Sequence, residues 1–428
     1  MADSTGREAV AAVWRIESAR IVGALARYTG DFALAEDLAQ EALAEALVTW
    51  PREGVPRNPA GWLLTVGRRR AIDTFRRRAA RDERYAVLAR DLGEGGTASG
   101  GAPADPAREA EDVLWDPDQI DDDVLALMFV SCHPVLSREA RVALTLRVVG
   151  GLTSDEIARA FLVPTATVQA RITRAKKTLG AARVPFAVPA ARERIARLGS
   201  VLNVVYVIFT EGSSASFGKD LLRWDLAGEA QRLARLLSRL VPEEPETHGL
   251  LALLELTAAR FPARTGADGR PVLLEHQDRR RWDRSAIVRG RAALARAERA
   301  GRGLGAYGLQ AAIAECHALA PSVEETDWER IVVLYEALGR LAPSPVVELN
   351  RAVAVSMARG PAAALPVVEA LADARELAHS HLLPSVRGEL LVRAGRREEA
   401  RVELERAVKL CGNDAERAVL EGKIADLG

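Results

Sequence analysis

Apolar residues recur at spacings of three and four along almost the whole chain, which is the period of an α-helix. The helix-favouring residues Ala, Leu, Arg and Glu dominate, and alternating β-branched runs are scarce. This pattern predicts an all-α protein. It breaks at the Gly-rich stretch Gly93–Ala107 and at the prolines of Val184–Pro189. We therefore expect helical units at 8–85, 120–183 and 188–428, with a flexible linker at 86–119.

The third unit contains weakly repeated helical turns. The segments YEALGRL, VVEALAD and LERAVKL align on Ala337, Ala370 and Ala407, which are 33 and 37 residues apart. A period of about 34 residues is typical of tetratricopeptide repeats, in which small residues let paired helices approach closely. The spacing predicts a helical repeat domain of this kind.

The segment Leu152–Leu179 (LTSDEIARAFLVPTATVQARITRAKKTL) predicts a helix-turn-helix. Thr153 and Glu156 have the spacing of a capping box, and Leu162–Pro164 forms a short turn before a second helix that opens at Pro164 or Thr165. The expected inner faces are Ile157, Ala158 and Phe161 on the first helix and Val168, Ile172 and Ala175 on the second.

The second of these helices carries its polar and basic residues on the outer side. Gln169, Ala170 and Thr173 lie where a recognition helix reaches base edges in a major groove. The basic residues that follow, able to neutralise phosphates, are Arg171, Arg174, Lys176 and Lys177. A solvated basic face is the alternative, but the capped first helix and the absence of acidic residues from position 169 to 183 favour DNA binding.

The first unit begins with an amphipathic helix over Asp31–Leu47. Its core stripe is Leu34, Leu38 and Ala42. Its polar face carries Asp37, Gln40 and Glu41 and suits a partner with basic or donor groups, although a merely solvated face fits the pattern equally well.

A second helix of this unit, ending near Arg78, is rich in arginine. The Pro- and Gly-containing stretch Pro51–Gly61 before it is expected to be non-helical. On the helix itself Trp62, Leu63 and Val66 should point inward and the arginines outward. Aromatic rings beside guanidinium groups can stack unpaired bases, so Trp50, Trp62 and Phe75 are candidates either for this role or for the core.

Charge is balanced overall but unevenly distributed. The chain has 428 residues, with 59 Lys plus Arg and 59 Asp plus Glu. Eight arginines lie between positions 68 and 84, whereas positions 82 to 123 hold thirteen acidic residues and three basic ones. Two basic patches are thus separated by an acidic connector.

Several features argue against membrane, secretory or metal classes. No apolar stretch approaches about 20 residues, and the N-terminus lacks the order of a signal peptide, so we expect a cytoplasmic protein without a membrane partner. Cys132, Cys316 and Cys411 match no CxxC pattern and are expected to be reduced core thiols.

Both motifs, in their order and separation, resemble the sigma-70 family of transcription initiation factors, specifically the small extracytoplasmic-function (ECF) group that keeps regions 2 and 4. The run DLAQEAL resembles region 2.2, and Leu152–Leu179 resembles region 4.2. From Ala190 onward, the segments YVIFTEGSSASFG, EHQDRRRWDR and LNRAVAV are similar to a subgroup with a tetratricopeptide-like C-terminal domain.

This resemblance implies partners and residue roles. The partners would be the core RNA polymerase, through its beta-prime clamp and beta flap, promoter DNA, and a regulatory protein or peptide at the C-terminal domain. The acidic linker would thread the polymerase interior and occupy the RNA exit path. The residues that contact polymerase would be Asp37, Gln40 and Glu41. The residues that contact the −10 element would be Trp62, Arg68, Arg69, Arg70, Arg76 and Arg77. The residues that contact the −35 element would be Thr165, Thr167, Gln169, Ala170, Arg171, Thr173, Arg174, Lys176 and Lys177. Ala170 departs from the polar reader common at its position but can contact a thymine methyl group.

Two other classes of protein compete with this interpretation. A metal or hydrolytic enzyme is suggested by Cys132-His133, Cys316-His317 and His379-x-His381, but the sequence pairs none of these into a ligand set. We therefore expect no catalysis, no metal and no cofactor. A one-component regulator with a ligand- or protein-sensing repeat domain explains the second and third units but gives the first unit no role.

Overall fold

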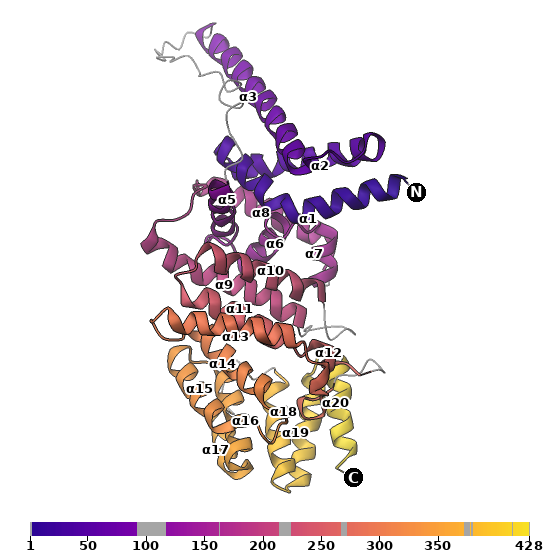
Figure 1. Cartoon of the computed structure of the whole chain (residues 1–428), viewed down its shortest axis with the longest axis vertical. Helices are drawn as coiled ribbons and strands as arrows, with labels where there is room; N and C mark the ends of the chain where they lie inside the picture. The colour runs from indigo at the N-terminus through magenta and orange to yellow at the C-terminus, as the bar shows by residue number, and fades with distance from the viewer. Residues whose placement is uncertain are drawn as a thin grey trace. The chain divides into compact units, whose positions relative to one another are not determined.

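The computed structural model describes residues 2–91, 117–161, 163–213, 224–266, 272–371, 377, 380–412 and 414–427, with the side chains of 2–8, 81–91, 117–121, 159–160, 191, 225 and 415 excepted. The described part of the chain is helical throughout, without a β-strand (Figure 1). The prediction of an all-α fold is confirmed. The predicted linker, Gly93–Ala107, lies outside the described residues.

The chain divides into two compact units, residues 1–204 and 205–428. The division falls inside helix α9 (Ala191–Ser213). The sequence predicted the start of the third unit earlier, at residue 188, after the proline pair. The first turns of α9 belong to the first unit, where Ser200 Oγ donates to the backbone carbonyl of Cys132 at 2.8 Å.

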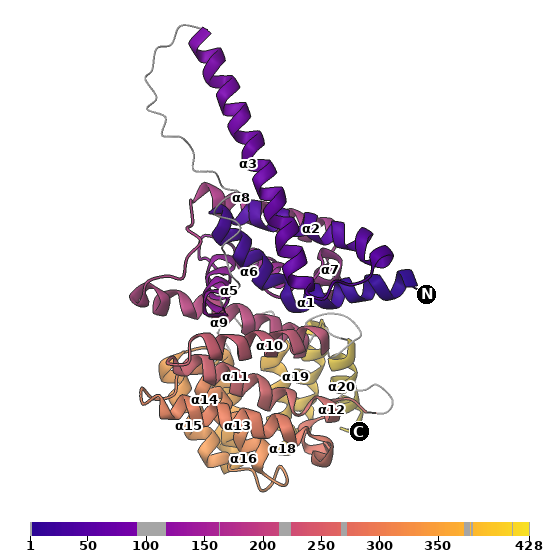
Figure 2. The ribbon, with the colours of Figure 1, turned by 45° about the horizontal axis from the view of Figure 1, so that its top comes forward.

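The first unit starts with three long helices. They are α1 (Ala2–Thr29), α2 (Phe32–Glu53) and α3 (Pro59–Asp91). Helices α1 and α2 pack closely against each other, and α3 extends well past both of them (Figures 1 and 2). Buried Leu25, Leu38 and Leu63 contribute one residue from each helix to their core.

The prediction that Pro51–Gly61 is non-helical is wrong at both ends of this stretch. Helix α2 continues through Pro51 to Glu53, and α3 already begins at Pro59. A proline is compatible with the first turn of a helix because its missing N–H has no partner there. Buried Trp50 holds the last turn of α2 in place, and Gly54, at φ 88°, ends the helix in a conformation that favours glycine. Only residues 54–58 connect the two helices.

Shorter helices complete the first unit. They are α5 (Pro117–Ser131), α6 (Arg138–Val148), α7 (Ser154–Phe161) and α8 (Thr165–Ala181), followed by the start of α9. Helix α5 packs against α1, and α6 and α7 pack against α8. Cys132, at the end of α5, is buried, and desolvation raises the pKa of its thiol to about 11. This cysteine is therefore a core thiol, as expected.

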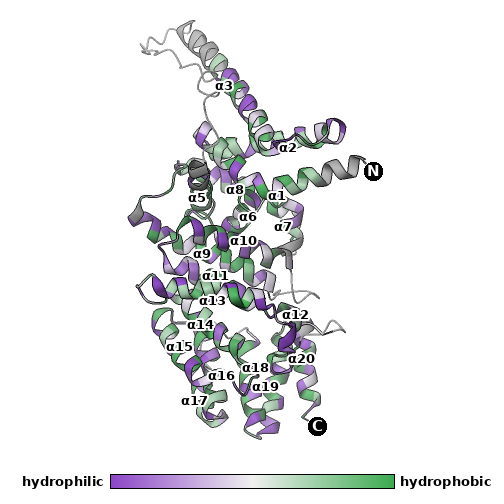
Figure 3. Ribbon diagram, viewed as in Figure 1, coloured by the Kyte–Doolittle hydropathy of each residue, from purple (hydrophilic) through white to green (hydrophobic). Residues whose placement is uncertain are grey.

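The second unit consists of successive packed helices. After the end of α9 come α10 (Trp224–Leu240), α11 (Pro245–Ala258), α12 (Phe261–Arg264), the 3-10 turns η1 (Leu274–His276) and η2 (Arg279–Arg281), α13 (Arg284–Arg299), α14 (Ala306–Leu319), α15 (Trp328–Leu341), α16 (Pro345–Arg359), α17 (Pro361–Glu369), α18 (Leu382–Arg393), α19 (Arg397–Leu410) and α20 (Asp414–Ala425). Sequence neighbours from α13 to α20 pack on one another. Hydrophobic and hydrophilic positions alternate around these helices (Figure 3).

The three aligned turns of the sequence fall at the C-terminal ends of alternate helices. Ala337 lies in α15, Ala370 directly follows α17, and Ala407 lies in α19. The sequence period therefore corresponds to two helices. The three alanines differ in burial, since Ala407 is buried and Ala370 exposed, so the tetratricopeptide assignment stays a prediction.

One expectation about membranes needs correction. Among the described helices, Arg192–Ser213 is long and apolar enough to cross a bilayer by length and composition, whereas the sequence reading found no such stretch. Core helices of soluble proteins pass the same test, and this one buries Val204, Val205 and Ile208 inside the protein.

Candidate nucleic-acid interface

The predicted helix-turn-helix is formed by α7 and α8. The backbone N–H of Glu156 donates to Thr153 Oγ1 at 3.2 Å, and Glu156 Oε2 accepts from the Thr153 N–H at 2.8 Å, which is a capping box. Thr165 Oγ1 donates to Asp155 Oδ1 at 2.8 Å and ties the start of α8 to α7. The residues expected on the inner faces are buried as predicted, with Phe161 partly so: Ile157, Ala158, Val168, Ile172 and Ala175.

The outer face of α8 is exposed at most of the predicted −35 positions. Exposed residues are Gln169, Ala170, Thr173, Arg174 and Lys177. Half-buried residues are Thr165, Thr167, Arg171 and Lys176. Helix α8 therefore presents one polar and basic strip, but Lys176 is turned away from it.

Lys176 is bound by two carboxylates of α2, Glu36 and Asp37, which together with Gln40 we call the acidic face of α2. Its Nζ lies 2.7 Å from Glu36 Oε2 and 2.6 Å from Asp37 Oδ1. The Lys176 side chain is 16% exposed and that of Glu36 only 5%. Burial alone would lower the pKa of Lys176, but the two carboxylates outweigh it and raise this pKa above its usual value.

Arg147 of α6 strengthens the same contact. It donates through Nη2 to Gln40 Oε1 at 2.6 Å, and its Nε lies 3.5 Å from Glu36 Oε1. Asp37 and Gln40, predicted to contact another protein, are thus both engaged within the chain. Glu41 is exposed and pairs with Arg70 at 3.0 Å.

Glu36 is the functional candidate that the sequence reading missed. It precedes the DLAQE run and is 4% exposed, although carboxylates are seldom buried without a partner. Its position between the polar face and the core stripe of α2 gave no separate signal in the sequence. Its role becomes visible only where Lys176 and Arg147 meet it.

Further ion pairs join the first three helices to the helices around α8. Arg27 Nε lies 3.0 Å from Asp123 Oδ2, and Arg15 Nη2 lies 2.8 Å from Glu156 Oε1. Burial raises the pKa of Asp123, against the opposing effect of Arg27. Gly151, at φ 71°, packs so closely that an added Cβ would lie 2.6 Å from Ser18 Oγ. These contacts pack α1 and α2 against α5, α7 and α8, and we call this the closed arrangement of the first unit.

The predicted −10 residues of α3 divide into paired and exposed groups. Arg69 and Arg70 reach Glu45 of α2, at 3.0 and 2.6 Å. The hydrogen bond to Glu45 is the main cause that raises the pKa of Arg70. Arg68 lies over the Tyr28 ring at 5.9 Å, and desolvation lowers its pKa. Arg76 and Arg77 are exposed.

The aromatic residues near α3 are mostly structural. Trp50 is buried and packs edge to face on half-buried Trp62, with ring centroids 5.6 Å apart. Phe75 and Tyr28 lie 6.4 Å apart. Trp50 thus belongs to the core, whereas Trp62 keeps one partly exposed side next to the 54–58 connection.

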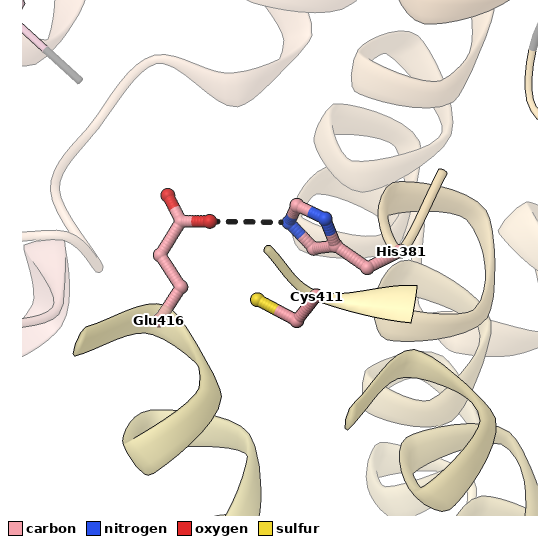
Figure 4. A group of neighbouring side chains, drawn as sticks. All are labelled: His381, Cys411 and Glu416. Carbon is pink, nitrogen blue, oxygen red and sulfur yellow. Dashed lines mark ion pairs between the residues drawn. The ribbon is translucent and has the colours of Figure 1, made fainter. Parts of the chain in front are cut away.

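A separate group of metal-binding residue types occurs in the second unit. His381 Nε2 lies 3.3 Å from Glu416 Oε2, and the ligand atoms of His381, Glu416 and buried Cys411 lie within 4.8 Å of one another (Figure 4). The sequence paired none of its cysteines and histidines, because these residues lie in three separate segments.

Comparison with known proteins places these observations in a family. Family models for sigma-70 region 2 and sigma-70 region 4 match residues 15–81 and 126–179. A family of unknown function (DUF6596) matches residues 197–298. The uncharacterized protein R00370 of Rhizobium meliloti is 46% identical over 407 residues, covering 95% of this chain and 93% of the relative. The chain belongs to the same family as this Rhizobium protein.

More distant relatives are ECF sigma factors. The probable ECF RNA polymerase sigma factor SigI of Mycobacterium tuberculosis is 26% identical over 186 residues, 44% of this chain and 59% of the relative. The ECF RNA polymerase sigma factor SigK of Mycobacterium ulcerans is 26% identical over 177 residues, 40% of this chain and 84% of the relative. The chain therefore carries sigma region 2 on α1–α3 and sigma region 4 on α5–α8, and these matches support a sigma factor role.

Proposed function

We propose that this protein binds core RNA polymerase and directs promoter-specific initiation of transcription. The observation that carries this proposal is the presence of sigma regions 2 and 4 in one chain, in the order of the ECF factors. Each region presents a helix with exposed basic residues, Arg76 and Arg77 on α3 and Arg174 and Lys177 on α8.

In this proposal α8 enters the major groove at the −35 element. The exposed side chains of Gln169 and Thr173 reach base edges, and Ala170 contacts a thymine methyl group. Arg174 and Lys177 contact phosphates and fix the position of the helix without reading sequence.

Region 2 acts at the −10 element. The connection at residues 54–58 and the partly exposed side of Trp62 take up unpaired bases, while Arg76 and Arg77 contact the backbone. Stacking on an aromatic ring contributes about 1–3 kcal/mol per base, which helps to keep melted strands apart. No step of this work requires catalysis by the chain itself.

In this proposal the acidic face of α2 binds either polymerase or Lys176 of α8, but not both at once. Asp37 and Gln40 are bound by Lys176 and Arg147 in the closed first unit. Polymerase that binds this face displaces Lys176, which is then free to join the exposed basic residues of α8 in contacting DNA. The closed arrangement would thus keep Lys176 from DNA until polymerase is bound, while exposed Arg174 and Lys177 can contact DNA non-specifically in the free factor.

We further propose that the second unit controls the first in cis. Substitution of Gly212, where an added Cβ would lie 2.4 Å from the Ala227 backbone nitrogen, disturbs the packing of the second unit without touching α3 or α8. Gly212→Val in the full chain should change transcription from a dependent promoter while DNA contacts stay intact. Unaltered transcription, in a variant whose unfolding shows the disturbance, would argue against control in cis.

Transcription from genomic DNA of the encoding organism, with only this protein and core polymerase, tests the main proposal. We expect discrete start sites preceded by shared sequences at −10 and −35. DNA binding without any start site above those of core polymerase would favour a one-component regulator instead.

A further inference from the structure

The second unit contains a pocket of about 460 Å³. It lies among α11, α12, η1, α18 and α20, and its walls are formed by apolar residues together with a few polar ones. Its charged and polar lining residues include Arg260, Arg264, Gln277, His381, Glu416 and Lys423. A volume of this size suits a small organic molecule, for which pockets of about 300–1,000 Å³ are usual.

Two arginines bring positive charge into this pocket without a carboxylate of their own. Arg260 donates through Nε to the amide oxygen of Gln277 at 3.3 Å, and Arg264 donates through Nη1 to the backbone carbonyl of Ser213 at 2.8 Å. Among the residues that the structure describes, no carboxylate lies within ion-pair distance of either guanidinium group. Charged side chains in a protein interior are normally paired.

The groups behind Arg260 add to the positive charge. Arg279 stacks on Trp282 at 4.7 Å, Arg260 stacks on the same ring at 5.5 Å, and Arg279 donates to the backbone carbonyls of His317 and Ala320. Burial, together with Arg264 and Arg279, lowers the pKa of Arg260 to about 10. The ring of Trp282 and the amide of Gln277 thus orient the guanidinium group of Arg260 without supplying negative charge.

The lining of the pocket carries little negative charge. Glu416 is the carboxylate among the lining residues, and it pairs with His381. Lys423 is bound by Glu389 outside the lining, so its charge is balanced there. The apolar lining residues include Leu273, Leu382 and Leu420.

We propose that this pocket binds a small organic anion, a carboxylate or phosphate on a short apolar body. The fork of donors on an arginine matches the oxygens of either group, and a charge-assisted hydrogen bond is about twice as strong as a neutral one. The anionic group lies between Arg260 and Arg264, and the apolar body lies against the leucines. This site rests on residues of the second unit and stands independently of a role in transcription.

The same charges disfavour a cation. His381, Cys411 and Glu416 are residue types that bind zinc, but Arg264 is close enough to Glu416 to interact with it electrostatically. A metal ion there would be repelled by this arginine, whereas an anion would be attracted to it. The two classes of ligand therefore predict opposite effects of removing the Glu416 charge.

Calorimetric titration of the full-length protein, in buffer free of phosphate and sulfate, tests the proposal. The probes are straight-chain carboxylates and alkyl phosphates of four to ten carbons, with the alcohol and the amine of each length as controls. We expect binding of a carboxylate, a phosphate ester or both, and the comparison identifies the preferred group. Failure of all anionic probes to bind, or equal binding of the amine, would overturn the proposal.

Two neutralising substitutions with opposite expected effects locate the site. Arg264→Gln should weaken the best probe at least tenfold, and Glu416→Gln should strengthen it several-fold, a gain that misfolding cannot imitate. Arg280→Gln is the matched control, because Arg280 is 89% exposed and pairs with Asp278. An affinity unchanged by Arg264→Gln, or lowered by Glu416→Gln in a protein with normal unfolding, would contradict binding at this site.

Discussion

The two units of the protein differ in the partners of their half-buried cations. In the first, Lys176 and Arg147 meet the carboxylate of Glu36, which is almost fully buried. In the second, Arg260 and Arg264 donate to an amide and a carbonyl, and among the described residues neither has a carboxylate within ion-pair distance, although Glu416 acts on Arg264 electrostatically. An unpaired charge in a protein interior is costly. The cations of the first unit have their carboxylate within the chain, whereas we propose that Arg260 and Arg264 of the second unit take theirs from a bound anion. Paired charges here fix a conformation, and unpaired ones indicate a ligand.

The largest effect should follow from removing the shared carboxylate of the first unit. Glu36→Gln leaves Arg147 and Lys176 without their buried partner, so the free energy of unfolding should fall by about 3 kcal/mol. Urea unfolding followed by circular dichroism measures this loss. Glu41→Gln, on the same helix but with a side chain 54% exposed, should cost about 0–1 kcal/mol. Equal losses in both variants would show that the Glu36 pairs are no stronger than surface ones.

A somewhat smaller effect is expected from pH in the second unit. Burial, with Arg260 and Arg279, lowers the pKa of His317 to about 4, against a usual value of 6.5. Below the usual pKa the unfolded chain binds a proton that the folded chain does not, so stability is lost as pH falls. Between about pH 7.5 and pH 5 this amounts to about 2 kcal/mol.

His317→Asn removes the titrating group and is the control for this pH effect. The variant should lose that part of the pH dependence of unfolding, measured by thermal denaturation across the same range. If it retained the full slope, the slope would arise from other groups, and the excess of positive charge around Arg260 would be smaller than inferred.

The smallest effect distinguishes neighbouring lysines on α8. Lys177 is exposed, whereas Lys176 is bound to Glu36 and Asp37. For non-specific binding of the free protein to duplex DNA, Lys177→Gln should reduce the slope of log K against log salt by about 0.9 for the lost phosphate contact. Lys176→Gln should leave this slope nearly unchanged. Equal reductions would mean that Lys176 reaches DNA without polymerase.

The sequence predicted local structure better than it predicted contacts over distance. The capping box of Thr153 and Glu156 and the inner face of α8 depend on residues a few positions apart, and both are present. Helix α2 continues through Pro51, directly after buried Trp50, a residue that the sequence left open between base stacking and core.

The ion-pair partners of the candidate residues could not be predicted from patterns of neighbouring residues. Lys176 and Glu36 are 140 positions apart, and no periodicity connects them. The half-buried Arg260 and Arg264 resemble any other arginines near a helix until their surroundings are known. Pairing of charge depends on tertiary structure, which a local pattern does not contain.

Polymerase and Lys176 of α8 are proposed to bind the same acidic face of α2. The affinity of the full-length protein for core RNA polymerase, measured for the wild type, Asp37→Arg and Lys176→Gln, tests this most directly. We predict that Asp37→Arg weakens binding at least tenfold and that Lys176→Gln, which frees the face, binds at least as tightly as the wild type. Wild-type affinity in the Asp37→Arg variant would contradict the claim.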